Sequence, residues 1–238
     1  MTSPMPAPMP APPQPAPSGA WLRSPAGLGR ATAVLLGLVV ATDLFACFAD
    51  FLVMSVAGDA ADGALDADLA HRADRADTLY ATAGVAQGAA LVATAVVYLC
   101  WLWRVRVNAE VFDASRHSMK RGWVIGGWFC PVVNLWFPRR IVLDCWEASA
   151  PWGARGGHAP VNAWWSVWIG SLLVGRAAYT QYDHAGTPAE LRDASRLMLF
   201  SDGLDIAAAV LAAVVVVHMT RLQNRKVLSG ELLTPAFG

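Results

Sequence analysis

Four long apolar runs, separated by segments rich in charged residues, divide most of the chain into predicted transmembrane helices. They cover approximately residues 31–57, 79–103, 161–179 and 199–220. A helix rises about 1.5 Å per residue, so about 20 apolar residues cross the roughly 30 Å hydrocarbon core of a bilayer. The pattern predicts an all-α polytopic membrane protein, whose four transmembrane helices form one membrane domain over residues 28–225.

The stretch from Gly122 to Arg140 is apolar but too short and too interrupted for an ordinary span. Its first sixteen residues would reach only about 24 Å as a straight helix, and Pro131 removes a backbone donor from the middle. If this stretch crossed the membrane, the basic residues at its end and those after the last span would both lie outside. A stretch that enters and returns keeps them in the cytoplasm, as the positive-inside rule favours. We therefore expect a re-entrant or interfacial segment over residues 122–150.

An amphipathic helix is predicted directly after this stretch, because Pro138 suits the first turn of a helix. Asp144 and Glu147 are assigned to its solvated face, and the helix is expected to lie in the membrane interface. Helical spacing places four apolar residues together on its other face: Ile141, Val142, Cys145 and Trp146.

Basic residues determine the expected topology in the cell membrane. With four spans, both termini lie in the cytoplasm, together with thirteen of the eighteen Lys and Arg residues. The same topology places all eleven tryptophans on the cytoplasmic side, although tryptophan normally occurs at both interfaces. This predicts a Trp/Arg-rich platform at the cytoplasmic leaflet, formed by residues 101–103, 123–152 and 164–168.

The two ends of the chain are expected to be cytoplasmic tails. Residues 1–27 contain most of the prolines and are predicted to be disordered, either as a spacer or as a ligand for a proline-binding module. Residues 226–238 form a short second tail.

Composition supports a membrane class and shows no pattern typical of catalytic, metal or nucleic-acid sites. Of the 238 residues, 55% are hydrophobic and only 15% are charged, with a net charge of zero; soluble domains have about 25% charged residues. The four cysteines and five histidines are scattered without metal-ligand spacing, and no catalytic signature is present. We expect no cofactor, no metal and no nucleic-acid partner, and a non-enzymatic protein is favoured.

Ionisable residues inside the predicted spans are the first candidate site. Asp43 and Asp50 lie on one face of the first span, and Arg176 lies at a similar depth in the third. Charges inside a bilayer are costly and face the bundle interior. One interpretation is an ion pair that holds the two spans together. The other is a proton- or ion-coupled site, which Asp202 and Asp205 of the fourth span would join.

Basic and aromatic residues on the cytoplasmic side are the second candidate site. Arg139 and Arg140 would bind a lipid headgroup or phosphate, with Asn134 and Trp136 beside them. The alternative is that the arginines only anchor the span ends, and that Asn134 satisfies the backbone groups freed by Pro131. Anionic membrane lipids are therefore expected partners, with a partner protein or a second copy of the chain as further candidates.

Three segments, WLWRVRVNAEVF, GWVIGGWFCPVVNLWFPRRIVLDCWEAS and VNAWWSVWI, resemble a family of actinobacterial membrane proteins, domain-of-unknown-function family four-three-two-eight. The resemblance covers roughly residues 80–225 and implies a membrane architecture without a particular activity. Its most specific elements are two Gly-Trp pairs, a Pro-x-x-Asn-x-Trp-x-Pro motif and a Trp-Trp pair, formed here by Gly122, Trp123, Gly127, Trp128, Pro131, Asn134, Trp136, Pro138, Trp164 and Trp165.

The expected function is that of a membrane-embedded interaction or regulatory module, whose platform contacts anionic lipid or a partner protein. The first alternative is an ion- or solute-transport component that uses Asp43, Asp50 and Arg176. The second alternative is an enzyme that processes lipid at the cytoplasmic interface, with a polar pocket over Asp144, Glu147 and Arg140.

Overall fold

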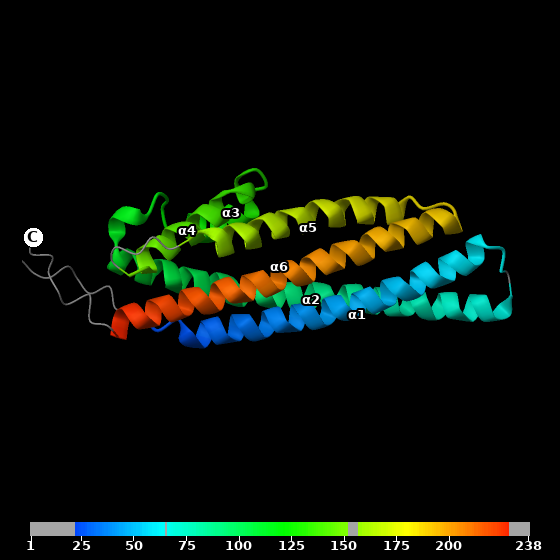
Figure 1. The fold of residues 1–238 in the computed structure, drawn as a ribbon, viewed down its shortest axis with the longest axis horizontal. Helices are drawn as coiled ribbons and strands as arrows, with labels where there is room; N and C mark the ends of the chain where they lie inside the picture. The colour runs from blue at the N-terminus through cyan, green and yellow to red at the C-terminus, as the bar shows by residue number, and fades with distance from the viewer. Residues whose placement is uncertain (1–21, 65, 152–156, 229–238) are drawn as a thin grey trace, which may run out of the picture.

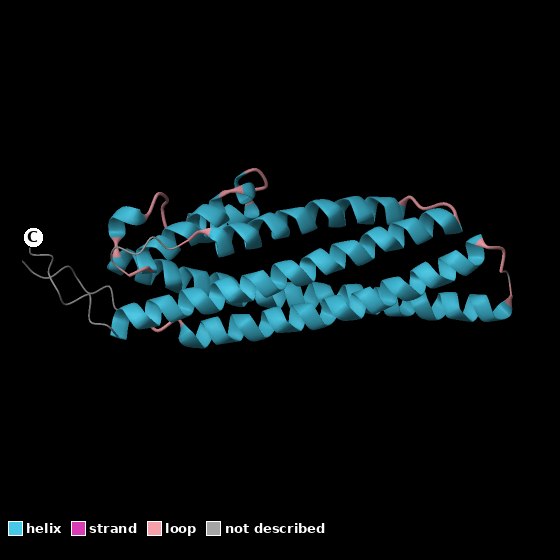
Figure 2. Cartoon of the chain, viewed as in Figure 1, coloured by secondary structure: helices cyan, strands magenta, loops and turns pink. Residues whose placement is uncertain are grey.

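The computed structural model describes residues 22–64, 66–151 and 157–228, which form six α-helices and two 3₁₀ turns. The described residues contain no β-strand, which confirms the all-α expectation (Figure 2). In chain order the elements are α1 (Ala26–Ala61), α2 (Ala67–Phe112), η1 (Ala114–Arg116), α3 (Trp123–Phe129), η2 (Val133–Leu135), α4 (Phe137–Ser149), α5 (Ala159–Asp183) and α6 (Pro188–Leu228).

The four long helices run side by side in alternating directions (Figure 1). α1 packs against α2 and α6, and α6 packs against α5. One end of the bundle, which we call the α3–α4 end, holds α3 and α4 together with the start of α1 and the end of α6. The opposite end, the loop end, holds the connections 62–66 and 184–187. Because α2 ends and α5 begins at the α3–α4 end, the segment between them returns to the side from which it started.

Three of the helices extend well beyond the predicted spans. α1, α2 and α6 have 36, 46 and 41 residues, so they are about 54 to 69 Å long, roughly twice the hydrocarbon thickness of a bilayer. The polar stretches 58–79 and 180–199, which lie between the predicted spans, are mainly helical. Local contacts stabilise this continuation: the Asp66 side chain accepts a hydrogen bond from the Leu69 N–H at 2.8 Å and so caps α2.

The predicted tails are correspondingly shorter. Residues 26–27 belong to α1 and residues 226–228 belong to α6. The rest of both predicted tails lies outside the described residues, apart from the short segment 22–25 that leads into α1.

Large apolar side chains face outward over much of the bundle, and small ones face inward. Among the described residues, α1, α2 and α6 are long and apolar enough to cross a membrane. α5, the helix of the third predicted span, is not among them. The inward positions include Ala46, Ala49, Ala83, Ala208 and Ala212, whereas the outward positions include Val34, Leu38, Leu44, Phe48, Phe51, Val85, Leu91, Val92, Val96, Val210 and Val214. This arrangement suits helices that pack closely in lipid.

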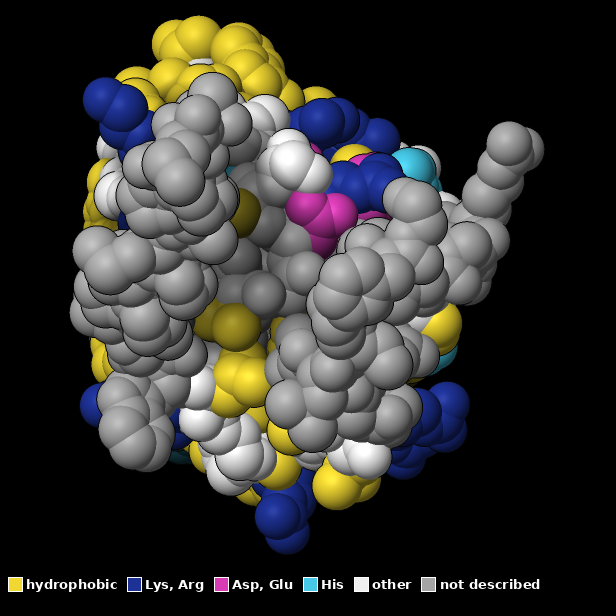
Figure 3. Space-filling view, turned by 90° about the vertical axis from the view of Figure 1, so that its left-hand side faces the viewer, with side chains coloured by type: hydrophobic (Ala, Val, Ile, Leu, Met, Phe, Trp, Pro, Cys, Tyr) yellow, Lys and Arg dark blue, Asp and Glu magenta, His cyan; other side chains and the backbone are white. Residues whose placement is uncertain are grey.

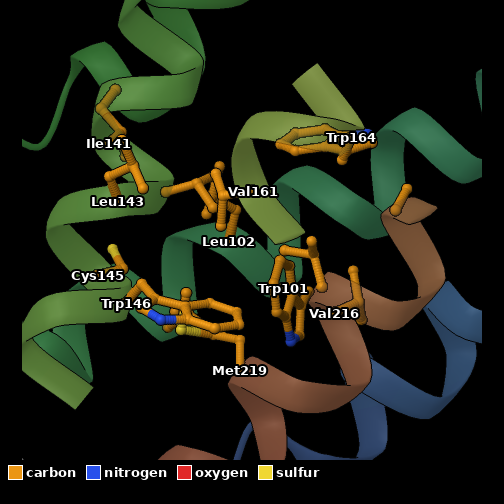
Figure 4. Packing of buried hydrophobic residues seen from close by; sticks show 14 of the residues in the cluster. Trp101, Leu102, Ile141, Leu143, Cys145, Trp146, Val161, Trp164, Val216 and Met219 are labelled. Atoms are coloured by element: carbon orange, nitrogen blue, oxygen red, sulfur yellow. The ribbon is translucent and has the colours of Figure 1, made fainter. Parts of the chain in front are cut away.

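The larger of two apolar cores in the described residues lies toward the α3–α4 end and contains buried residues of all six α-helices (part of it is drawn in Figure 4). Trp101 of α2 is completely buried and faces Val216 and Met219 of α6. Trp146 of α4 and Trp164 of α5 complete the cluster from the other side. Together with Ile141, Val142 and Cys145, which are buried as predicted, Trp146 forms the apolar face of the amphipathic α4.

A buried amide network ties this end of the bundle together. Gln223 of α6 has no exposed surface; its Nε2 donates to the Val105 carbonyl of α2 at 2.9 Å and to Ser149 Oγ of α4 at 3.1 Å. Asn108 Nδ2 donates to Gln223 Oε1 at 3.1 Å and to the Arg23 carbonyl at 2.8 Å. The network therefore joins α2, α4, α6 and the segment that leads into α1.

α1 and α6 approach each other closely at Gly29. A Cβ added to this glycine would lie 2.5 Å from Thr220 Oγ1. That hydroxyl is already engaged, since it accepts a hydrogen bond from Trp101 Nε1 at 3.0 Å and donates to the Val216 carbonyl at 2.7 Å. Thr220 is therefore held in place and has little freedom to move away from a larger residue at position 29.

We predict that Gly29→Ala destabilises the folded protein by about 1–3 kcal/mol, because the added methyl group pushes α1 away from Thr220. Thermal unfolding in detergent measures the effect as a lower Tm. Gly27→Ala is the matched control, since it makes the same change in the same turn and its Cβ meets open space. Equal melting temperatures for the two variants would contradict the close approach of α1 and α6.

Candidate functional site

Four aspartates from two helices gather inside the bundle. Asp43 and Asp50 of α1 are only 4% and 3% exposed, and Asp202 and Asp205 of α6 are partly buried. The spacings of seven residues on α1 and three on α6 place each pair on one helix face. These four residues are called the carboxylate cluster below.

Gln87 of α2 bridges the carboxylate cluster. Its Nε2 donates to Asp43 Oδ1 at 3.0 Å and to Asp202 Oδ1 at 3.2 Å. The carboxyl groups of Asp50 and Asp202 also lie next to each other across α1 and α6. Asp43 Oδ2 is buried and has no hydrogen-bond partner among the described residues.

No cation balances the carboxylate cluster within the part of the chain that the structure describes. None of the ion pairs there includes any of the four aspartates. Arg176, expected to pair with Asp43 and Asp50, is exposed on α5 and takes part in none of these ion pairs. Neutral polar groups beside the cluster include Ser171 of α5, which lies near Asp205, and Cys47 and Tyr80, which lie near Asp50 and Asp202. The Ser171 hydroxyl itself donates to the Trp168 carbonyl at 2.9 Å.

The carboxylate cluster lies within the band of outward-facing apolar side chains. On α1 this band runs from Val34 to Phe51, and on α6 it runs from Phe200 to Val214. Asp43 and Asp205 are near the middle of these ranges. A carboxylate at such a depth is costly unless a proton or a cation accompanies it.

The geometry of the cluster favours a proton or a small monovalent cation over a polydentate metal site. Among the described residues, no group of three or more His, Cys, Asp or Glu side chains is arranged to hold a metal ion. Two neighbouring carboxyl groups, such as Asp50 and Asp202, share a proton readily because two negative charges side by side repel each other.

Sequence reasoning found the four aspartates but missed Gln87. The available signal was that Gln87 is the single Asn or Gln side chain between residues 79 and 103. Its distances to Asp43 and Asp202 depend on how three helices pack, which the sequence pattern does not give.

Arg139 and Arg140, expected to bind a lipid headgroup, both have partners within the chain. Arg139 Nε and Nη2 donate to Asn162 Oδ1 of α5 at 3.1 and 2.7 Å. Arg140 pairs with the Asp144 carboxylate at 3.0 Å. The two arginines therefore hold α4 to α5 and to its own next turn.

Asp144 is buried, which corrects its assignment to the solvated face of α4. It is only 2% exposed and accepts hydrogen bonds from Ser118 N at 3.0 Å and Ser118 Oγ at 2.7 Å. Glu147 is more exposed and pairs with His158 at 3.0 Å and with Arg116 at 3.5 Å. Both acids thus anchor the loops around α4.

Tryptophans of α3 and α5 form one continuous aromatic cluster. Trp128 packs edge-on against Tyr98 of α2 and against Trp165 and Trp168 of α5, with ring centroids 5.5 to 6.2 Å apart. The rings of Trp164 and Trp165 form a T-shaped pair with their centroids 5.5 Å apart. The Trp-Trp pair and the second Gly-Trp pair therefore pack α3 onto α5.

The remaining motif residues shape the turn from α3 into α4. Gly127 is buried, and a Cβ there would lie 3.3 Å from Phe137 Cβ, so the glycine lets the two helices cross. Pro131 falls in the break after α3, and Pro138 lies in the first turn of α4, as predicted. Gly122 is the N-cap of α3, Trp123 contacts Phe137 at 4.9 Å between ring centroids, and Trp136 is exposed.

Asn134, another motif residue, lies in the 3₁₀ turn η2 between α3 and α4. Its Oδ1 is buried and has no hydrogen-bond partner among the described residues. Its backbone N–H donates to the Cys130 carbonyl at 2.8 Å. The Asn134 side chain was expected to satisfy backbone groups freed by Pro131. Its Oδ1 does not do so.

Charged residues surround the α3–α4 end face (Figure 3), where Lys and Arg side chains lie around the rim and an Asp/Glu patch adjoins them. Arg106, only 4% exposed, pairs with Glu110 and donates to the Met119 carbonyl at 2.8 Å. Glu110 also pairs with Arg121. Burial, together with the positive charge of Arg106, lowers the pKa of His117, which lies in the same loop.

A family model matches residues 64–221, and its description is Domain of unknown function (DUF4328). This is more than half of the 238 residues. The chain belongs to this family. The match spans the aromatic cluster, α3, α4 and the α6 half of the carboxylate cluster, whereas Asp43 and Asp50 of α1 precede it. No curated protein and no solved structure matches the chain.

We predict that protonation of His117 destabilises the folded DUF4328 chain as the pH falls below about 6.5. Its pKa is lowered from 6.5 in the folded state, so the unfolded chain binds the proton first. The charged groups that face His117 are Arg106 and Glu110 of α2 and Asp144 of α4. His117→Gln should therefore raise the melting temperature, relative to the unchanged protein, by more at pH 5.5 than at pH 7.5.

His184→Gln is the control for this prediction, because His184 is exposed at the loop end. It should keep the pH dependence of the unchanged protein. If His117→Gln behaved like this control, the loop around His117 would not couple protonation to folding.

Proposed function

We propose that this protein is an ion- or solute-transport component of the membrane that binds protons or a small monovalent cation at the carboxylate cluster. The observation that supports the proposal most directly is Gln87, whose amide donates to Asp43 of α1 and Asp202 of α6 at once. A neutral donor orients both carboxylates without cancelling their charge, so their occupancy by protons or cations remains adjustable.

The cluster joins all four long helices, which favours coupling over a purely local role. α1 and α6 contribute the carboxylates, α2 contributes Gln87, and α5 contributes Ser171. Removing a proton from Asp50 or Asp202 would place two negative charges side by side across α1 and α6. A change in protonation would therefore alter the packing of the helices that hold the site.

The proposal treats α5 as a fourth membrane helix. Its 25 residues span about 37 Å, and Leu172 and Leu173 face outward from it. With four spans, both ends of the chain lie on the side of the α3–α4 end, where basic residues favour the cytoplasm of the cell. Residues 122–150 then form the re-entrant or interfacial element.

A second candidate function is the interaction or regulatory module with a Trp/Arg-rich platform. It is favoured by the outward-facing aromatic side chains of Trp103, Trp123, Phe129 and Trp136 around the α3–α4 end. The platform is smaller than the sequence suggested, because Trp101, Trp146, Trp164 and Trp165 are buried in the core. For a lipid-processing enzyme the support is weaker, since Asp144, Glu147 and Arg140 are engaged in ion pairs.

Proton flux into liposomes tests the transport proposal. Liposomes with a pH-sensitive dye inside, an imposed pH gradient and an ionophore to dissipate the membrane potential should acidify faster with the protein than without it. Asp43→Asn should lower the protein-dependent rate by about tenfold or more, because it removes an ionisable group whose buried environment leaves no substitute. The same vesicles with a sodium gradient test the monovalent cation.

Asp74→Asn is the control, since Asp74 is exposed in the N-terminal part of α2. This variant should transport at the unchanged rate, and far-UV circular dichroism should show that both variants remain folded. Protein-containing vesicles that match empty ones under both gradients would rule out transport. They would leave the platform as the better supported function.

A further inference from the structure

A groove opens beside the cytoplasmic-facing part of α2, between the start of α1 and α3. Its volume is about 780 Å³, within the range of small-molecule and lipid sites. The apolar part is lined by Leu28 of α1, Leu99 and Val107 of α2, and Ile125 of α3. Trp103 stands at its side and is 39% exposed.

Two arginines lie at the polar edge of this groove. Arg23 precedes α1 and Arg104 lies on α2, one turn beyond Cys100, which also lines the groove. Neither arginine belongs to an ion pair among the described residues, in contrast to Arg106, Arg116, Arg121 and Arg140. The Arg104 side chain makes a long hydrogen bond of 3.5 Å to the Ser24 carbonyl.

The backbone that carries Arg23 is held firmly at the groove. The Arg23 N–H donates to Asn108 Oδ1 at 3.2 Å, and its carbonyl accepts from Asn108 Nδ2 at 2.8 Å. Asn108 is itself buried, lines the groove and is fixed by Gln223. The two guanidinium groups thus extend from fixed positions beside an apolar channel.

We propose that this groove binds one anionic phospholipid, whose phosphate is bound by Arg23 and Arg104 and whose acyl chain lies along Leu28, Leu99 and Ile125. Charge complementarity carries this assignment: among the described residues, the lining of the groove has two arginines and no acidic residue. The order of groups also fits a lipid, because the arginines and Trp103 lie at the end of the outward apolar band of α2. The site replaces Arg139 and Arg140, whose donors are already used within the chain.

Lipid retention by native mass spectrometry tests the proposal. The full chain is reconstituted in nanodiscs of phosphatidylcholine with one fifth phosphatidylglycerol, extracted in mild detergent, and analysed for bound lipid. We expect phosphatidylglycerol to be retained about tenfold over its share in the disc, and Arg23→Gln with Arg104→Gln to remove this preference. Cys100→Trp, which fills the groove without a change in charge, should also lower retention.

Arg30→Gln is the matched control, because Arg30 is an exposed arginine of α1 outside the groove lining. It should retain phosphatidylglycerol like the unchanged chain, and equal melting temperatures should show that all variants are folded. Equal retention of the two lipids by the unchanged protein, or full retention by the double arginine variant, overturns the proposal.

Two other occupants would appear as different results. If 10 mM inorganic phosphate alone raises the melting temperature as much as phosphatidylglycerol does, the site binds phosphate and the lipid assignment is wrong. If the unchanged chain does not retain phosphatidylglycerol but a chain lacking residues 1–20 does, the N-terminal segment is the occupant and the proposal fails.

Because the groove variants lie far from Asp43, their proton flux in liposomes separates this proposal from the transport function.

Discussion

The side-chain amide of Gln223 is the interaction on which the α3–α4 end depends. It has no exposed surface. Its amide nitrogen donates to α2 and α4, and its oxygen accepts a hydrogen bond from Asn108 of α2. Buried amides are costly when unpaired, so each helix that meets Gln223 is held at the position that satisfies it. The attachment of α4 and of the segment before α1 follows from this requirement.

Aromatic packing holds α5 to the rest of the bundle. Large rings rather than close backbone contacts join α2 to α5, with Tyr98 against Trp164 at one level and Tyr80 stacked on Tyr182 at another. Trp128 of α3 fills the space between these helices near Tyr98. The Trp164–Trp165 pair and Trp128 therefore act here in helix packing. The carboxylate cluster, in contrast, is partly built from α1 residues that precede the matched region.

Local features were predictable from the sequence, whereas contacts between distant residues were not. The apolar runs that became α1, α2 and α6, and the helix start at Pro138, follow from hydropathy and backbone chemistry within a few residues. The helical extensions through 58–79 and 180–199 depend on caps and ion pairs at the helix ends, which weak polar patterns do not reveal. The hydrogen bond from Arg139 to Asn162 joins residues far apart in sequence. The sequence therefore suggested that Arg139 could bind a lipid headgroup, although its donors are used within the chain.

Two properties of the α1–α6 pair suggest how the proposed ion site would act on the bundle. At the α3–α4 end, Gly29 brings α1 against Thr220, and the hydrogen bond from Trp101 holds that threonine still. Farther along, the same helices face each other through carboxylates, with Asp50 next to Asp202. Repulsion after loss of a proton would therefore separate α1 and α6 only beyond the pinned contact. The pair would open toward the loop end, while the groove at Arg23 and Arg104 kept its shape.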